Sequence, residues 1–255
     1  MPAGAGFGTF YDLGAGPNWR RSRCALPGPG CGPGEVMRVM ADRVGKTGRV
    51  VGLDIDGNLG REGLSVLHGI GYTQCSFVEG DLQSLEKNES NRFDLVYGRL
   101  VVEHMDDPID GLKQMYRWVK PGGHLVIQDH YHPSLDADPA SEVVDEVKRT
   151  FAAVWKKVGR EPRTGIRLPG HFISAGIGAP DGTDVAGDLL PMRQSAAMGA
   201  AVYRSLLPLA LKFGITTEER SQYFFQMASE AQDDENSYVL WPLIISVWKR
   251  KPDSE

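Results

Sequence analysis

The sequence predicts an α/β fold built on a mostly parallel sheet with helices on both faces. Between about residue 34 and residue 129, short apolar segments of strand length alternate with amphipathic segments of helix length. Such alternation is typical of βαβ units, whose strands lie parallel in one sheet. Composition agrees, since 41% of the 255 residues are hydrophobic and 24% are charged, as in an ordinary globular protein.

The predicted elements of this region follow from the spacing of apolar residues. At 35–44, Val36, Val39, Met40 and Val44 share one helical face. The same reasoning predicts helices at 62–69 and 108–119 and strands at 49–55, 76–79, 93–97 and 124–129.

Beyond residue 129 the alternation ends. Helices are predicted at 142–159, at 194–213 and from Thr217 onward, where a threonine side chain can cap the helix start. A glycine-rich stretch at 165–187 is predicted to hold one strand, and 238–249 a final strand. We therefore expect a helical, substrate-side insertion after the fifth strand, over about residues 132–215.

Composition also limits the function classes. The net charge is −5 and no broad basic face is indicated, which argues against nucleic acid as a partner. Three unpatterned cysteines indicate neither a disulfide framework nor a metal site. No apolar run is long enough for a membrane span, and the N-terminal residues show no apolar region typical of a secretory signal. We expect a cytoplasmic protein that acts on a small molecule, with a homodimer left open.

A glycine loop directly before the first helix is the first candidate binding feature. Glycines let a ligand approach the backbone, and a helix start presents free N–H groups. Acidic or polar residues follow the next strands, where ligands of open α/β sheets bind. The candidate residues are Gly30, Cys31, Gly32, Gly34, Asp54, Ile55, Asp81, Leu82, Arg99 and Leu100.

Dinucleotide binding is the rival interpretation of such a loop. That fingerprint requires G-x-G-x-x-G, and its third glycine position here is Glu35. The pattern is instead G-x-G-P-G, followed by Asp54 and Asp81 after successive strands. Asp54 is placed to accept both hydroxyls of a ribose, and Asp81 an adenine amino group.

These motifs resemble those of class I S-adenosylmethionine-dependent methyltransferases, close to the quinone-biosynthesis-like group. The resemblance is carried by CGPGEVMRVMADRVGKTGRVVGLDID, FVEGDLQSL, FDLVYGRLVVEHMDDP and VKPGGHLVIQD. It covers about Gly30 to Asp129 and implies a Rossmann-like fold, S-adenosyl-L-methionine as cofactor and methyl transfer to a small, fairly apolar metabolite. The methyltransferase domain would span 30–255.

The resemblance also implies a role for each candidate residue. Gly30, Gly32 and Gly34 would approach the methionine portion, and Asp54 would hold the ribose with Ile55 on the adenine face. Asp81 and Leu82 would bracket adenine, while Arg99 and Leu100 would line the methionyl end. His104, His130 and His132 are candidates for a general base or for positioning the acceptor.

The sequence departs from the family pattern before the glycine loop. Residues 1–29 form an irregular segment rich in glycine and proline, and Gly28 stands where the family has an acidic residue. Pro27 and Pro29 fall where a central strand is expected, and proline cannot donate to a sheet ladder. This composition suggests a truncated or frame-shifted start, and it leaves open whether the enzyme is active.

Two alternatives therefore stay open. One is a catalytically impaired or non-enzymatic protein of this fold with a degenerate first strand. The other is a cyclase or isomerase that uses the same scaffold without methyl transfer.

Overall fold

The computed structural model of the chain describes residues 24–27, 34–82 and 90–253. The chain divides into two compact units, each described here by itself. The sheet unit comprises the described residues up to Asp129 together with Gly165–Asp184 and residues 245–253. The helical unit comprises His130–Thr164 and Val185–Ile244. In the described parts of the chain, no helix has the length and apolarity needed to cross a bilayer.

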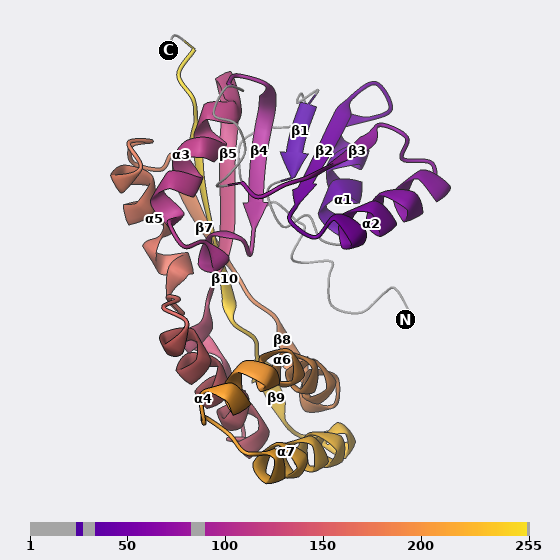
Figure 1. The fold of residues 1–255 in the computed structure, drawn as a ribbon, viewed down its shortest axis with the longest axis vertical. Helices are drawn as coiled ribbons and strands as arrows, with labels where there is room; N and C mark the ends of the chain where they lie inside the picture. Colours follow the sequence, from indigo (N-terminus) through magenta and orange to yellow (C-terminus); the bar gives the residue numbers. More distant parts are fainter. Residues whose placement is uncertain (1–23, 28–33, 83–89, 254–255) are drawn as a thin grey trace. The chain divides into compact units, whose positions relative to one another are not determined.

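A seven-stranded sheet with the order β3-β2-β1-β4-β5-β10-β7 forms the framework of the sheet unit (Figure 1). The pairs β1/β2, β1/β4, β2/β3 and β4/β5 are all parallel, as the sequence predicts. The strands are β1 (Cys24–Pro27), β2 (Arg49–Asp54), β3 (Cys75–Glu79), β4 (Phe93–Arg99), β5 (Val119–Tyr131), β7 (Gly182–Ala186) and β10 (Leu243–Arg250).

Three helices connect the parallel strands. They are α1 (Glu35–Val44), α2 (Gly57–Gly69) and α3 (Pro108–Trp118), and α1 and α2 pack on β1, β2 and β3 while α3 packs on β4. Met37 and Met40 of α1 are fully buried in a core with Val50, Leu95 and Tyr97. The predicted helix at 35–44 is confirmed in both of its limits.

Helix α2 begins five residues earlier than its apolar pattern predicts. The Asp56 side chain accepts from the N–H groups of Asn58 and Leu59, which caps the helix start. The first two turns bury glycines, Gly57, Gly60 and Gly63, so apolar periodicity carries no signal there.

The central strand β1 lies in a segment whose composition predicts irregular structure. Its backbone pairs with β2 at Cys24 and Ala25 and with β4 from Ala25 to Pro27. Pro27 is the last residue of the strand, so the donor that proline lacks falls at the strand end. The structure therefore contains the central strand that the two prolines were expected to disrupt.

The helical unit contains three long helices and a three-stranded antiparallel sheet with the order β6-β9-β8. The helices are α4 (Glu142–Lys157), α6 (Met192–Lys212) and α7 (Glu218–Glu230). The strands are β6 (Asp136–Asp138), β8 (Leu189–Pro191) and β9 (Tyr238–Leu240). Tyr203 of α6 stacks on Phe224 of α7 with ring centroids 3.9 Å apart, and both side chains are fully buried.

Two expectations for the C-terminal half differ from the structure. The glycine-rich stretch contains a helix, α5 (Thr164–Ser174), as well as strand β7. The final apolar segment is two strands, β9 and β10, because Pro242 lies between them.

Candidate functional site

The carboxyl end of β2 places a buried carboxylate next to an exposed apolar side chain. Asp54 is 8% exposed, and its Oδ1 accepts from the N–H of Asp56 at 2.9 Å. Ile55, directly after the strand, is 73% exposed. A carboxylate accepts hydrogen bonds from hydroxyl groups, and an exposed branched side chain offers an apolar face to a flat ring. This pair has the chemistry to hold a nucleoside.

The segment after β3 places an exposed acidic residue directly before a buried leucine. Asp81 is exposed, whereas Leu82 is 3% exposed. A methyl group added at Gly111 of α3 would lie 3.5 Å from Leu82 Cδ2, so this side chain packs on α3. The structure thus places Asp81 at the surface of the carboxyl end of the sheet and anchors it through Leu82.

The start of α1 requires glycine at its last loop position. Gly34 has φ +90° and is buried. A Cβ there would lie 3.0 Å from Leu67 Cδ1, in addition to the strain of the left-handed conformation. The other loop residues predicted from the sequence, Gly30, Cys31 and Gly32, lie outside the described residues.

The carboxyl end of β4 leads into a strained turn. Arg99 ends the strand, and Leu100 has φ +52°, which is rare for a residue with a side chain. The N–H of Leu100 donates to Gln128 O at 2.8 Å, and a short 3-10 helix, η2 (Val102–His104), follows. Such a strained backbone conformation persists only where surrounding contacts hold it, and in proteins it is frequent at functional sites.

Two buried carboxyl groups lie beside this turn, and neither is among the candidate residues predicted from the sequence. Asp129 of β5 is fully buried, and Glu103 of η2 is 5% exposed. Asp129 Oδ2 accepts from the N–H of Val102 at 3.1 Å. The available signal was an acidic residue that ends the apolar run HLVIQ.

Electrostatics give Asp129 an unusual proton affinity. Burial raises the pKa of its carboxyl well above the usual range, and the neighbouring Glu103 carboxylate raises that pKa further. Hydrogen bonds from the N–H groups of Val102 and Glu103 and the charge of Arg99 lower the pKa in part. Burial is the largest of these effects.

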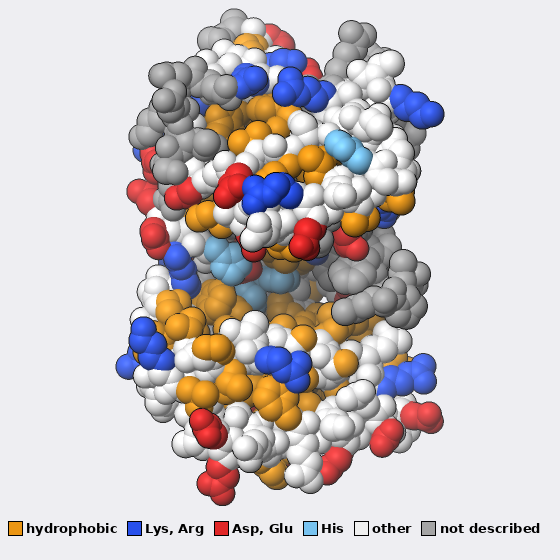
Figure 2. Space-filling model, turned by 45° about the vertical axis from the view of Figure 1, so that its right-hand side comes forward, with side chains coloured by type: hydrophobic (Ala, Val, Ile, Leu, Met, Phe, Trp, Pro, Cys, Tyr) orange, Lys and Arg blue, Asp and Glu red, His pale blue; other side chains and the backbone are white. Residues whose placement is uncertain are grey.

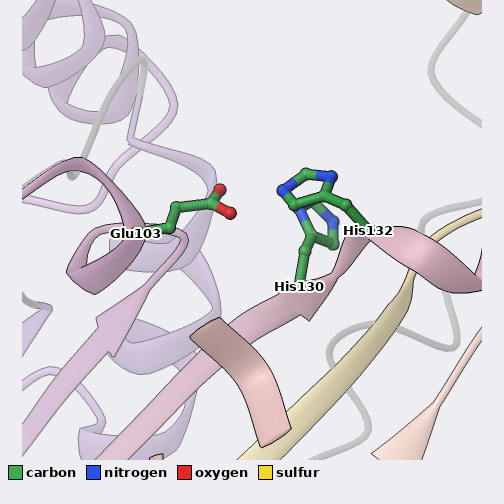
Figure 3. Close-up of side chains that lie close together, drawn as sticks. All are labelled: Glu103, His130 and His132. Carbon is green, nitrogen blue, oxygen red and sulfur yellow. The ribbon is translucent and has the colours of Figure 1, made fainter. Parts of the chain in front are cut away.

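The three candidate histidines fall in different units. His104 belongs to the sheet unit, and its Nε2 lies 3.6 Å from the Glu103 carboxylate. His130 and His132 belong to the helical unit, where their ring centroids lie 4.9 Å apart at the end of β5 and in the turn after it (Figure 3). The His132 ring also lies 4.0 Å from that of Phe151 in α4.

Residues 28–127 match the family described as a methyltransferase domain. A demethylmenaquinone methyltransferase of Oceanobacillus iheyensis is 32% identical over 105 residues, which are 41% of this chain and 44% of that protein. The corresponding enzyme of Bacillus pumilus is 33% identical over the same shares. The matched region therefore spans less than half the length of these relatives.

Two solved structures share the fold at low sequence identity. A phosphoethanolamine N-methyltransferase of Haemonchus contortus, in complex with phosphomonomethylethanolamine and S-adenosylhomocysteine, has a TM-score of 0.53 and 16% identity over 90% of this chain and 49% of that one. An arsenic(III) S-adenosylmethionine methyltransferase of Chlamydomonas reinhardtii has a TM-score of 0.53 and 16% identity over 91% and 64%. Residues 28–127 are therefore similar to a methyltransferase domain, and the two solved structures share the fold of the chain.

Proposed function

We propose that this chain uses S-adenosylmethionine to methylate a small, fairly apolar metabolite. The single observation that carries the proposal is the end of β2, where the buried Asp54 carboxylate adjoins the exposed Ile55 side chain. A nucleoside needs both features, a hydrogen-bond acceptor for its ribose and an apolar surface for its base. Both lie at the carboxyl end of a parallel strand, where open α/β sheets bind ligands.

Other residues of the sheet unit would complete the cofactor site. Gly34 leaves the start of α1 open to close backbone approach, which a Cβ would obstruct. Asp81 would accept from the adenine amino group, with Leu82 beneath it, and Arg99 and Leu100 would line the methionyl end. When bound, S-adenosylmethionine would supply an electrophilic methyl group on its sulfonium, to which the acceptor lone pair would form a bond in line as the methyl–sulfur bond breaks and S-adenosylhomocysteine leaves.

The protein contributes alignment and exclusion of water to such a displacement. An acceptor that carries N–H or O–H also loses a proton, and His104, His130 and His132 are the side chains proposed to take it. On the face that Figure 2 shows, hydrophobic side chains are exposed over the helical unit, with charged side chains between them and at its rim. Together with the net charge of −5, this surface favours an apolar metabolite over a polyanion.

The direct test is cofactor affinity in an Asp54→Ala variant. Loss of charge-assisted hydrogen bonds to the ribose should weaken S-adenosylhomocysteine binding by more than about tenfold, measured by titration calorimetry. Asp94→Asn is the matched control, since Asp94 lies near the amino end of β4 and pairs with Lys120 at 3.2 Å. An Asp54→Ala affinity equal to that of the wild type would refute the assigned site.

A further inference from the structure

The turn after β4 is held by two consecutive residues of the neighbouring strand. Leu100 has φ +52°, in the left-handed region that is unfavourable for a residue with a side chain. Its N–H donates to Gln128 O at 2.8 Å, and two residues later the N–H of Val102 donates to Asp129 Oδ2 at 3.1 Å. The two acceptors on β5 therefore hold the strained residue and the residue two positions after it.

The second bond replaces a cap that the turn itself lacks. Val101 occupies the N-cap position of η2, and its aliphatic side chain makes no capping hydrogen bond. The first N–H groups of such a helix need an acceptor, especially when they are buried. The Asp129 carboxylate, 27 residues further along the chain, accepts from the N–H group of Val102. The backbone N–H of Glu103 also lowers the pKa of this carboxyl.

Burial makes this cap stronger than an ordinary surface cap. Asp129 is fully buried, and Val101 and Val102 are also buried. Water cannot replace a lost acceptor at such a buried position. An unsatisfied N–H group would therefore destabilise the turn by its full desolvation free energy. The exposed cap of α3 offers a contrast, because Asp107 holds the N–H groups of Ile109 and Asp110 at the surface.

We propose that Asp129 is a positioning residue that fixes the turn from Arg99 to Glu103 and thereby sets the affinity for the methionyl end of the cofactor. Asp129 acts through backbone N–H groups, and it need not touch the ligand. The link to the ligand rests on the proposed function, in which Arg99 and Leu100 line that end of the cofactor. The link to the turn rests on the geometry alone.

Two variants separate the cap from the charge. Asp129→Ala removes the acceptor, and amide hydrogen exchange at Val102 and Glu103 should become at least tenfold faster in the ligand-free protein. Asp129→Asn retains an acceptor oxygen, so exchange should stay within about threefold of the wild type. If Asp129→Ala does not fold, Asp129→Ser takes its place, since a hydroxyl on a shorter side chain also loses the bond.

The same variants are then titrated with S-adenosylhomocysteine. Affinity should fall about tenfold in Asp129→Ala and be restored in Asp129→Asn. Asp107→Ala is the matched control, and it should speed exchange at Ile109 and Asp110 while leaving Val102 and the affinity unchanged.

The outcomes distinguish this proposal from the proposed function. Unchanged exchange at Val102 in Asp129→Ala overturns the positioning role, whatever the affinity does. Faster exchange with wild-type affinity overturns the link to the cofactor. A wild-type chain that does not bind S-adenosylhomocysteine overturns the proposed function and that link, and exchange at Val102 then still decides whether Asp129 holds the turn.

Discussion

Acidic residues at the carboxyl ends of β2, β3 and β5 occupy three different surroundings. Asp81 is exposed, Asp54 is buried beside an exposed isoleucine, and Asp129 is fully buried next to Glu103. An exposed acid interacts mainly with water, whereas a buried acid interacts strongly with each neighbouring charge and dipole. The same residue type can therefore bind a ligand at one strand and organise the backbone at another.

The raised pKa of Asp129 predicts how stability depends on pH. The folded pKa lies above the unfolded pKa, so the stability that protonated Asp129 contributes is complete below the unfolded pKa. That stability is lost as the pH rises toward the raised folded pKa. Asp129→Asn does not ionise and should gain stability relative to the wild type over this window, by about 1.4 kcal/mol for each unit of pKa difference.

Denaturant unfolding of both proteins at pH 4.5 and pH 8 measures this change. Relative to the wild type, the free energy of unfolding of Asp129→Asn should be higher at pH 8 than at pH 4.5. Glu103 and Arg99 are present in both proteins, so only the Asp129 side chain differs between them. A difference that is constant with pH, or that moves toward the wild type, contradicts a raised pKa.

At this scale the sequence predicts local chemistry better than long-range chemistry. The cap that Asp56 provides to α2 is local, because its partners lie two and three residues away. Asp129 and Val102 are 27 residues apart, and nothing local in the sequence links them. An acid that ends an apolar strand looks the same in sequence whether it faces water or a buried turn.

At the scale of elements, a buried carboxylate connects helices α4 and α7. Glu146 of α4 is 3% exposed and accepts from Nε and Nη2 of Arg220, with the shortest contact at 2.7 Å. Arg149, one turn along α4, pairs with the same carboxylate. Two cations therefore compensate one buried negative charge.

Removing the long-range partner should destabilise the helical unit. Arg220→Ala leaves the buried Glu146 with Arg149 as its cation and the Thr150 hydroxyl as a donor. A loss of about 2 kcal/mol is expected, below the value for a buried charge without any partner. The free energy of unfolding from denaturant titration measures the loss. Lys157→Ala, at the exposed end of α4, is the control and should stay within about 0.5 kcal/mol of the wild type. Equal values for the two variants would show that the Glu146 pair contributes nothing specific.

Elements with a continuous apolar period were predictable, and elements rich in glycine and proline were not. Helix α1 has apolar residues on one face throughout, so both of its limits follow from the sequence. Helix α5 contains Gly165, Pro169 and Gly170, which oppose helix formation locally. Its buried Leu168 and Phe172 show that packing in the folded chain outweighs this local preference.

At the scale of the whole molecule, neither unit is a continuous segment of the chain. The chain passes between the units after Asp129, Thr164, Asp184 and Ile244. Strand β10 returns from the C-terminal part and takes its place beside β5. The motifs at 30–129 could therefore predict the strands from β2 to β5, but the edge of the sheet beyond β5 depends on residues that carry no motif.

This topology predicts that a fragment of residues 1–129 does not fold by itself. Without β10, Leu125 and Ile127 of β5, both fully buried in the chain, would lie at an unpaired sheet edge. The bonds from Gln128 Nε2 to Ser246 Oγ at 2.8 Å and from Lys251 N to Gly123 O at 2.8 Å would also be lost. The fragment should aggregate or unfold without a cooperative transition, whereas the full chain should unfold cooperatively on heating.

Circular dichroism melts of the two proteins make the comparison, and extending the fragment to residue 253 should restore the transition. A cooperative melt of the 1–129 fragment would show that the sheet is complete without its C-terminal strands.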